Sequence, residues 1–408
     1  MTNLLGKIRI PEHCLWGGEG DSARESVNGS AISSWWPAHF FGASGRFKTG
    51  DGTIFLQTGV LDLAFHSTNI TPVALFTIQN EFRYEVVRKI FEGGMGIVYE
   101  AEQHGARDFI KRIAIKVVRQ NYADQKQFID NFIGEAKLVA DLIHTNIVQT
   151  YHLGETRGIF FIAMELIRGV NLEQFAQQLH DKRRVLPKEL AVFIVSRIAR
   201  GLAYAHAKVD KDGRPLGIVH RDVSFKNIMI AFEGDVKLTD FGIAKARGFL
   251  VDNEGEVVAG KADYMSPEQA NFQITDRRSD IFSAGVVLAH LLLGKNLFKG
   301  ATAEESRNRM MTMPIPDFRA LDERVDERLN EILLRTMARD IDKRYPTADQ
   351  LLYDLEHYIY HSGYGPTNET LGKYIRDLFG QTAPSSAGGS AKGNTVIMDA
   401  AASGHARG

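Results

Sequence analysis

Short apolar runs and longer runs with helical periodicity divide the chain into predicted elements. The runs at 84–90, 113–118 and 160–165 are brief and rich in β-branched or aromatic residues, which is typical of strands. The stretch 191–207 and the strongly apolar stretch 281–293 predict helices. The middle of the chain therefore predicts strands and helices that bury a large core.

Two charged residues fall at positions that this pattern predicts to be buried. Lys116 interrupts the apolar strand 113–118, and Glu135 lies on the apolar face of a helix predicted at 125–143. A buried charge is costly unless it is paired. We therefore expect an ion pair between Lys116 and Glu135, the alternative being a lysine that reaches solvent and an unrelated glutamate. The rest of the apolar face comprises Phe128, Phe132, Val139, Leu142 and Ile143.

The two ends of the chain differ from its middle. Residues 1–81 are Gly-rich, with scattered β-like runs, and we interpret them as a small β-rich extension of unknown function, the alternative being an independent sensor. Residues 362–380 carry an amphipathic stripe, which we expect to dock on the preceding helical part of the chain. Residues 381–408 are mostly Ala, Gly and Ser and predict a disordered tail. The stripe is made of Leu371, Ile375, Leu378 and Phe379.

Composition and charge argue against several kinds of partner. Acids and bases nearly balance in the 408 residues, with a formal net charge of −1, so no basic footprint for nucleic acid or membrane is present. Cys14 is the only cysteine, which excludes an internal disulfide and agrees with a reducing compartment. No secretion signal is visible, and the stretch 281–293 is too short to cross a bilayer. We expect a cytoplasmic protein without a membrane span.

The stretch 218–227, which reads I-V-H-R-D-V-S-F-K-N, carries the clearest chemistry. Asp222 and Asn227 are five positions apart and can face one site from a short loop. Phosphoryl transfer needs such a pair, since the carboxylate can orient a hydroxyl nucleophile while the amide oxygen helps to hold a magnesium ion. In isolation the motif is equally compatible with a polar loop between two strands.

A glycine-rich turn lies between two predicted strands. Gly93, Gly94 and Gly96 would bring backbone N–H groups close to phosphate oxygens without side chains in the way. A plain hairpin turn is the alternative. Phe91 stands where a nucleotide-binding loop of the pattern G-x-G-x-x-G would have its first glycine.

These motifs together resemble the protein kinase family. The resemblance extends over about residues 82–361, and G-G-M-G and Y-M-S-P-E-Q-A resemble the bacterial (Hanks-type) serine/threonine kinases. It implies an α+β fold with a small β-rich lobe and a larger helical lobe. It also implies ATP with Mg²⁺, or Mn²⁺ in its place, and protein substrates. The supporting positions are H-R-D-x-x-x-x-N at 220–227, D-F-G at 240–242, S-P-E at 266–268, Asp280 and Arg344.

The same resemblance implies a role for each candidate residue. Asp222 would be the catalytic base, Lys116 would bind the α- and β-phosphates when oriented by Glu135, and Arg221 would pair with a loop phosphate. Asn227 and Asp240 would hold the metal. Glu268 would pair with Arg344, and Asp280 would either anchor the catalytic loop or be an ordinary acid of a helix N-terminus. The adenine site would comprise Val98 and Ala114 above the ring, Met229 below it, Met164 as gatekeeper, and the hinge Glu165 to Ile167.

Two positions depart from the family pattern in a related way. Ser224 stands where serine/threonine kinases have a lysine, and Lys261 stands where they have a threonine. We hypothesise that the two groups are exchanged, so that Lys261 supplies the ammonium near the transferred phosphate and Ser224 the hydroxyl. Lys226 is the competing source of charge, and Lys261 as a solvated loop lysine is the plain alternative.

The segment between Ile243 and Asp263 contains no Ser, Thr or Tyr. Phosphorylation of this loop, which would pair with Arg221, therefore has no acceptor there. The segment carries Asp252, Glu254 and Glu256 instead. We predict activity that is independent of phosphorylation in this segment, with the loop held by carboxylates or by a partner.

The leading interpretation is a serine/threonine protein kinase of bacterial signalling. A pseudokinase or scaffold that binds nucleotide weakly is the main alternative, favoured by Phe91 and Ser224. A small-molecule phosphotransferase shares the chemistry of Asp222 and Asn227 but would lack the peptide-binding features at 266–268. Any regulatory partner is expected to act through residues 1–81 or the tail.

Overall fold

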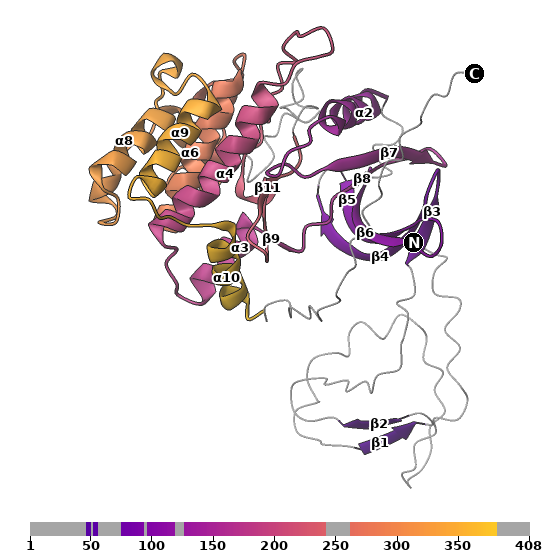
Figure 1. Cartoon of the computed structure of the whole chain (residues 1–408). Helices are drawn as coiled ribbons and strands as arrows, with labels where there is room; N and C mark the ends of the chain where they lie inside the picture. The colour runs from indigo at the N-terminus through magenta and orange to yellow at the C-terminus, as the bar shows by residue number, and fades with distance from the viewer. Residues whose placement is uncertain are drawn as a thin grey trace, which may run out of the picture. The chain divides into compact units, whose positions relative to one another are not determined.

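The computed structural model describes residues 75–93, 96–118, 126–241 and 262–381, together with the backbone of two short strands near the N-terminus (Figure 1). The chain divides into two compact units, residues 1–71 and 72–408. In the first, β1 (Arg46–Thr49) pairs antiparallel with β2 (Gly52–Phe55). The expected tail beyond residue 381 and the remainder of residues 1–74 lie outside the described residues.

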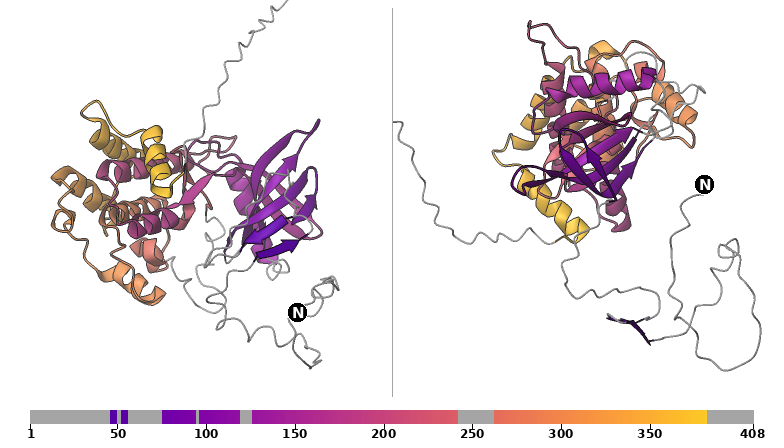
Figure 2. Two further views of the ribbon diagram at one scale, coloured as in Figure 1. Left: turned by 90° about the horizontal axis from the view of Figure 1, so that it is seen from below. Right: turned by 90° about the vertical axis from the view of Figure 1, so that its right-hand side faces the viewer.

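The second unit begins with an antiparallel sheet of six strands in the order β3-β4-β5-β6-β8-β7. Alternate side chains of these strands point to one face, where they form an apolar core that includes Tyr84, Ile113, Ile115 and Phe161. Figure 2 shows the sheet as a layer to one side of the helices. Its strands are β3 (Phe76–Gln79), β4 (Arg83–Glu92), β5 (Gly96–His104), β6 (Ile110–Val118), β7 (Thr150–Thr156) and β8 (Ile159–Met164).

Helix α2 (Lys126–Ala140) belongs to this sheet lobe. Phe132 and Ala136 pack with Val118 and Ile162 in a small apolar cluster. The prediction that Ile143 shares the buried face was wrong, because α2 ends at Ala140 and Ile143 is 72% exposed in the turn that follows. The helical phase used for the prediction no longer applies beyond that end.

A second, three-stranded sheet of order β11-β10-β9 lies at the start of the helical lobe. It is formed by β9 (Gly169–Asn171), β10 (Ile228–Ala231) and β11 (Val236–Leu238), so residues on both sides of the predicted catalytic loop are brought together. The Val148 N–H donates to the Leu238 carbonyl at 2.8 Å and connects the segment before β7 to this sheet.

The helical lobe is built around α6 (Arg277–Leu293), in which 13 of 17 residues are buried. Asp276 caps its N-terminus by accepting from the Arg278 N–H, and Gly294 ends it in the left-handed conformation at φ 68°. The described residues contain no helix long and apolar enough to cross a membrane. The other helices of the lobe are α3 (Leu172–Asp181), α4 (Lys188–His206), α5 (Pro267–Ala270), α7 (Ala303–Thr312), α8 (Glu327–Thr336), α9 (Ala348–Tyr360) and α10 (Asn368–Phe379).

The architecture is therefore the predicted α+β fold with a small β-rich lobe and a larger helical lobe. Both lobes contribute to the region where the sequence places its candidate chemistry.

Candidate active site

The predicted catalytic loop is held by one buried carboxylate. Asp280 is 1% exposed and accepts hydrogen bonds from the backbone N–H groups of His220 and Arg221, both at 2.7 Å. His206 lies 2.8 Å from the same carboxylate. Burial alone would raise the pKa of the Asp280 carboxyl, but its hydrogen bonds and the nearby histidines outweigh burial and lower that pKa. Asp280 thus anchors the loop, which is one of the two roles considered for it.

The loop is also joined to the end of β11. His220 Nε2 lies 3.1 Å from the Thr239 carbonyl oxygen, and the ring centroids of His220 and Phe241 are 4.4 Å apart. The Thr239 N–H donates to the Asn227 carbonyl at 3.0 Å. Asp222 and Asp240 therefore come from two segments that are hydrogen-bonded to each other.

Lys116 forms an ion pair with Asp240 at 2.6 Å, although β6 and the segment after β11 belong to different lobes. The lysine side chain is only 14% exposed, as its position in a buried strand predicted. Asp240 has a left-handed backbone at φ 57°, which turns the chain after β11. Glu135 lies on α2, and the arrangement of its side chain is outside the described residues, as is Gly242.

Asn227 and Asp240 offer the oxygen atoms that a hard cation requires. The Asn227 amide nitrogen donates to the Asp222 carbonyl at 2.9 Å, which orients the amide. Among the described residues no hydrogen bond is made to Asn227 Oδ1. An amide oxygen and a carboxylate suit Mg²⁺, which binds through few protein oxygens and keeps part of its water shell. These residues therefore fit the metal that the motif predicts.

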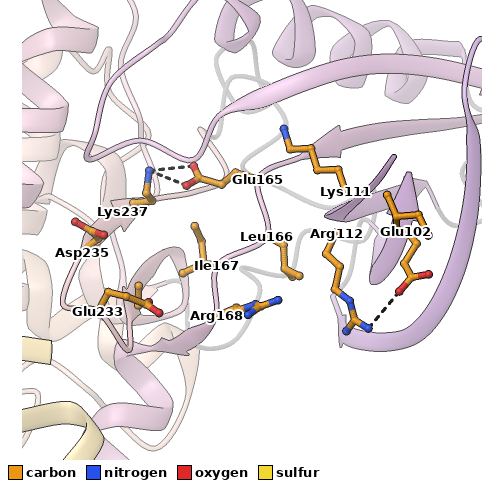
Figure 3. A pocket seen from close by; sticks show the side chains of 12 residues that line it. Glu102, Lys111, Arg112, Glu165, Leu166, Ile167, Arg168, Glu233, Asp235 and Lys237 are labelled. Atoms are coloured by element: carbon orange, nitrogen blue, oxygen red, sulfur yellow. Dashed lines mark hydrogen bonds and ion pairs between the residues drawn. The ribbon is translucent and has the colours of Figure 1, made fainter. Parts of the chain in front are cut away.

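The residues expected around adenine come from both sheets: Val98, Ala114 and Met164 from neighbouring strands of the six-stranded sheet, and Met229 from the three-stranded sheet. Ala114 on β6 pairs with Met164 on β8, Val98 pairs with Lys116, and Met229 on β10 pairs with Lys237 on β11. The hinge begins at Glu165, whose N–H donates to the Gln149 carbonyl at 2.8 Å. The Glu165 carboxylate pairs with Lys237 at 2.9 Å (Figure 3).

A cavity of about 620 Å³ lies beside the hinge (Figure 3). Charged side chains of both lobes line it, and neither Val98, Ala114 nor Met229 does. Of the residues expected around adenine, only those of the hinge line it. The main residues are Glu102, Lys111, Arg112, Arg168, Glu233 and Asp235 together with the hinge.

The glycine turn is tight where it is described. The Gly93 N–H donates to the Gly96 carbonyl at 2.9 Å, and a Cβ on Gly96 would come within 2.7 Å of the Val117 carbonyl oxygen. Gly94 lies outside the described residues. Phe91 is 47% exposed, and a Cβ on Gly93 would meet its ring at 3.0 Å. The phenylalanine thus lies against the turn where the family pattern has a glycine.

The S-P-E segment at 266–268 is fastened to the helical lobe by Arg344. Its guanidinium binds the Glu268 carboxylate at 2.7 and 2.8 Å. The Ser279 hydroxyl donates a further hydrogen bond of 2.6 Å to that carboxylate. The side-chain amide of Gln269 donates to the Arg221 carbonyl at 3.0 Å. The S-P-E segment is therefore connected both to the lobe and to the catalytic loop.

A stacked contact in the helical lobe was not foreseen from the sequence. Phe225, in the catalytic loop, stacks on His290 of α6 with ring centroids 4.0 Å apart and an interplanar angle of 6°. The Tyr264 hydroxyl lies 2.9 Å from His290 Nδ1. Burial, and then the charge of Lys299, lowers the pKa of His290 to about 4, so its ring is neutral at pH 7 and Nδ1 can accept from the Tyr264 hydroxyl. The sequence signal was a single histidine within the apolar run 281–293.

The remaining candidates have distinct surroundings. Arg221 is half-buried with a left-handed backbone at φ 62°, and its Nε donates to the Thr275 hydroxyl at 3.2 Å. Ser224 is 7% exposed. Lys226 is half-exposed and lies 3.9 Å from the Glu173 carboxylate. Lys261 falls in the range 242–261, outside the described residues.

Comparison with known proteins supports the class that this geometry defines, a two-lobed phosphotransferase. The model of the protein kinase domain family matches residues 84–355. The tyrosine-protein kinase MasK of Myxococcus xanthus is 36% identical over 298 residues, which are 73% of this chain and 46% of that protein. The serine/threonine-protein kinase PrkC of Bacillus subtilis is 35% identical over 276 residues, 67% of this chain and 40% of PrkC.

The chain belongs to the protein kinase family. It spans less than half the length of MasK and PrkC. A crystal structure of the Mycobacterium tuberculosis PknI kinase domain has the same fold, with a TM-score of 0.51 at 24% identity over 67% of this chain and 94% of that domain. Family membership implies the use of ATP and a divalent metal.

Proposed function

We propose that the protein is a serine/threonine protein kinase that transfers the γ-phosphate of ATP to protein hydroxyls in bacterial signalling. The observation that carries the proposal is the 2.6 Å contact between Lys116 and Asp240, next to a loop that Asp280 anchors. Residues 82–361 are the proposed catalytic domain, and residues 362–380 a helical extension. Use of ATP and the absence of a disulfide favour the cytoplasm.

In this proposal Asp222 orients the substrate hydroxyl and accepts its proton late in the transfer. Asn227 and Asp240 would hold Mg²⁺, which when bound neutralises charge that develops on the phosphate oxygens. Lys116 binds the α- and β-phosphates, and Glu135 is the predicted second carboxylate partner of this lysine. The hydrogen bond from the Asn227 side-chain amide to the Asp222 carbonyl, 2.9 Å long, keeps base and metal ligand at a fixed spacing.

The source of positive charge at the transferred phosphate is a separate part of the proposal. The position after Val223 is Ser224, which has no charge, so we assign the ammonium to Lys261. Lys226 is a weaker candidate because it is half-exposed and faces Glu173 at 3.9 Å. We expect Lys261→Ala to reduce kcat by about 10²-fold and Lys226→Ala by less than about threefold. A fully active Lys261→Ala would refute the exchange.

The decisive experiment is incubation with labelled ATP and Mg²⁺, comparing wild type with Asp222→Asn. Label transferred by wild type alone supports a kinase, whereas nucleotide binding without transfer supports the pseudokinase. Amino-acid analysis of the labelled product identifies the acceptor. This step matters because MasK is named as a tyrosine kinase and PrkC as a serine/threonine kinase, so the two relatives differ in acceptor.

Regulation is proposed to be independent of phosphorylation between residues 243 and 263. That segment has no acceptor hydroxyl, and the Arg221 guanidinium already donates to Thr275. Mapping phosphates before and after full activation tests the idea. Activity that follows a phosphate on Tyr264 or Ser266 would contradict it. A partner that binds residues 1–81 or the tail is the proposed alternative input.

A further inference from the structure

We propose that α10 positions the floor of the nucleotide site. This helix lies beyond residues 84–355, which match the kinase family. It holds the turn between β10 and β11, and those two strands carry Met229 and lead to Asp240. The proposal rests on the proposed function, because it assigns α10 a role in binding ATP.

The apolar face of α10 docks firmly on the helical lobe. Leu371, Ile375 and Leu378 are each 0% exposed and belong to the main apolar core. The Tyr374 ring packs 6.3 Å from Phe175 of α3, and Figure 1 shows α10 beside α3. The Lys182 ammonium donates to the Leu378 carbonyl near the C-terminus of α10. These contacts with α3 would be enough to anchor the helix.

A second set of contacts reaches the β10–β11 turn, residues 232–235. The Arg376 guanidinium donates to the Phe232 carbonyl at 2.6 Å. The Asn368 side-chain amide donates to the Asp235 carboxylate at 2.6 Å. Both ends of the turn are therefore bonded to α10, through residues two helical turns apart.

The backbones of the helix and the turn touch between these bonds. Gly234 has φ 99°, and a Cβ there would come within 1.7 Å of the Asn368 carbonyl oxygen. A Cβ on Gly372 would come within 2.5 Å of the Glu233 carbonyl oxygen. The two glycines thus allow the backbones of turn and helix to come closer than any side chain would permit. This close contact fixes the distance between the turn and α10.

The turn is closely connected to the nucleotide site. β10 has four residues and β11 has three, so the hairpin has little length over which a shift of the turn can be absorbed. Met229 pairs with Lys237, and Lys237 pairs with Glu165 of the hinge at 2.9 Å. Figure 3 shows Glu233 and Asp235 near this pair. A displaced turn would therefore move the floor and the hinge together.

The test uses the full chain and measures ATP affinity directly by calorimetry, well below the melting temperature. We expect Gly372→Ala to weaken ATP binding about tenfold, because the added methyl separates helix and turn. Arg376→Ala removes one bond and should weaken binding about threefold, and Arg376→Lys should restore part of it. Lys373→Ala, on the exposed face of α10, is the matched control and should bind like wild type.

Hydrogen exchange shows whether α10 positions the β10–β11 turn or only docks on the helical lobe. We expect faster exchange at residues 229–238 in Gly372→Ala and Arg376→Ala. Variants that melt earlier but keep wild-type ATP affinity and wild-type exchange in this range would overturn the proposal. Wild type that binds ATP but transfers no phosphate would refute the kinase activity and leave the affinity comparison as a valid test of α10.

Discussion

Arg344 and Glu268 form a buried, two-bonded ion pair although 76 positions separate them in the chain. The guanidinium side chain is 0% exposed and the carboxylate 9%. This geometry is stronger than a single hydrogen bond, since each of the two terminal guanidinium nitrogens donates to a different carboxylate oxygen. The pair connects the S-P-E segment to the residues between α8 and α9.

Removal of this arginine should be among the most destabilising substitutions in the helical lobe. We expect Arg344→Ala to lower the free energy of unfolding by about 3–5 kcal/mol, because it leaves the Glu268 charge buried and unpaired. Urea unfolding measures the change. Lys343→Ala is the matched control, since Lys343 is 77% exposed and should change stability by less than about 0.5 kcal/mol.

The pH dependence of this pair has a definite sign. Burial would raise the pKa of Glu268, but the bonds from Arg344 outweigh it and lower that pKa. The pair therefore contributes its full stability above the carboxyl pKa of the unfolded chain and loses it as pH falls through the lower folded value. Arg344→Ala should show less acid destabilisation than wild type. An identical acid dependence in both proteins would contradict this account.

Substitution of Asp280 should impair the catalytic loop more than the fold. In Asp280→Asn the amide can accept only one of the two backbone N–H bonds, which come from His220 and Arg221 at 2.7 Å. We expect kcat to fall at least about tenfold, with faster hydrogen exchange at residues 220–222.

Asp276→Asn is the control for Asp280→Asn, because it makes the same change on the same helix. Asp276 is the N-cap of α6, and asparagine caps helices about as well as aspartate. The control should keep nearly full activity. Equal losses in the two variants would show that α6 itself, and not the anchoring carboxylate, is sensitive.

His290 should make the protein less stable in mild acid. Its pKa is lowered to about 4 in the folded protein, against an ordinary value of 6.5, so folding favours the neutral form of the His290 ring. The contribution of the neutral ring to the free energy of unfolding is complete above pH 6.5, and it is lost as the pH falls from 6.5 toward 4. Between pH 7 and pH 5 the loss should be about 2 kcal/mol.

His290→Gln isolates this effect, since glutamine does not titrate and can still accept from the Tyr264 hydroxyl. Urea unfolding at both pH values should show a smaller decrease in the variant than in wild type. If the decrease is the same, His290 is not the group responsible.

Glu100 should stabilise the sheet lobe through its two arginines. The carboxylate is buried on β5 and meets Arg88 at 2.7 Å and Arg112 at 2.8 Å. Because both arginine side chains remain largely exposed, Glu100→Gln should cost only about 1–2 kcal/mol, measured by thermal unfolding at low salt. Glu102→Gln is the control, since Glu102 meets Arg112 at the longer distance of 3.2 Å and should matter less. A larger effect for Glu102 would contradict this ranking.

Much of the site could be predicted because its residues lie in short motifs with strong physical requirements. Lys116 had to find an anion in a buried strand, and the structure shows one in Asp240. The sequence did not point to Asp240, since helical periodicity relates residues of one element and does not reveal which distant segment a strand will face. The predicted pair with Glu135 stays a prediction, because that side chain lies outside the described residues. The amphipathic stripe of α10 likewise predicted docking but not the turn on which it docks.

Contacts that depend on packing between distant elements could not be predicted. His290 was one polar residue within an apolar run, and nothing in that pattern connects it to Phe225 or Tyr264. The glycines at 234 and 372 are similar, because each is an ordinary turn or helix glycine until the two backbones meet. Ile143 was misplaced because a helix end shifts the phase of every residue after it.

The contact between Lys116 and Asp240 joins residues 124 positions apart, one from each lobe. Any rotation that opens the angle between the lobes must lengthen it, whereas motion within a single lobe need not. The distance between these two side chains therefore measures how far the two lobes are closed. A pair of spectroscopic labels placed beside them would report how far the two lobes are open.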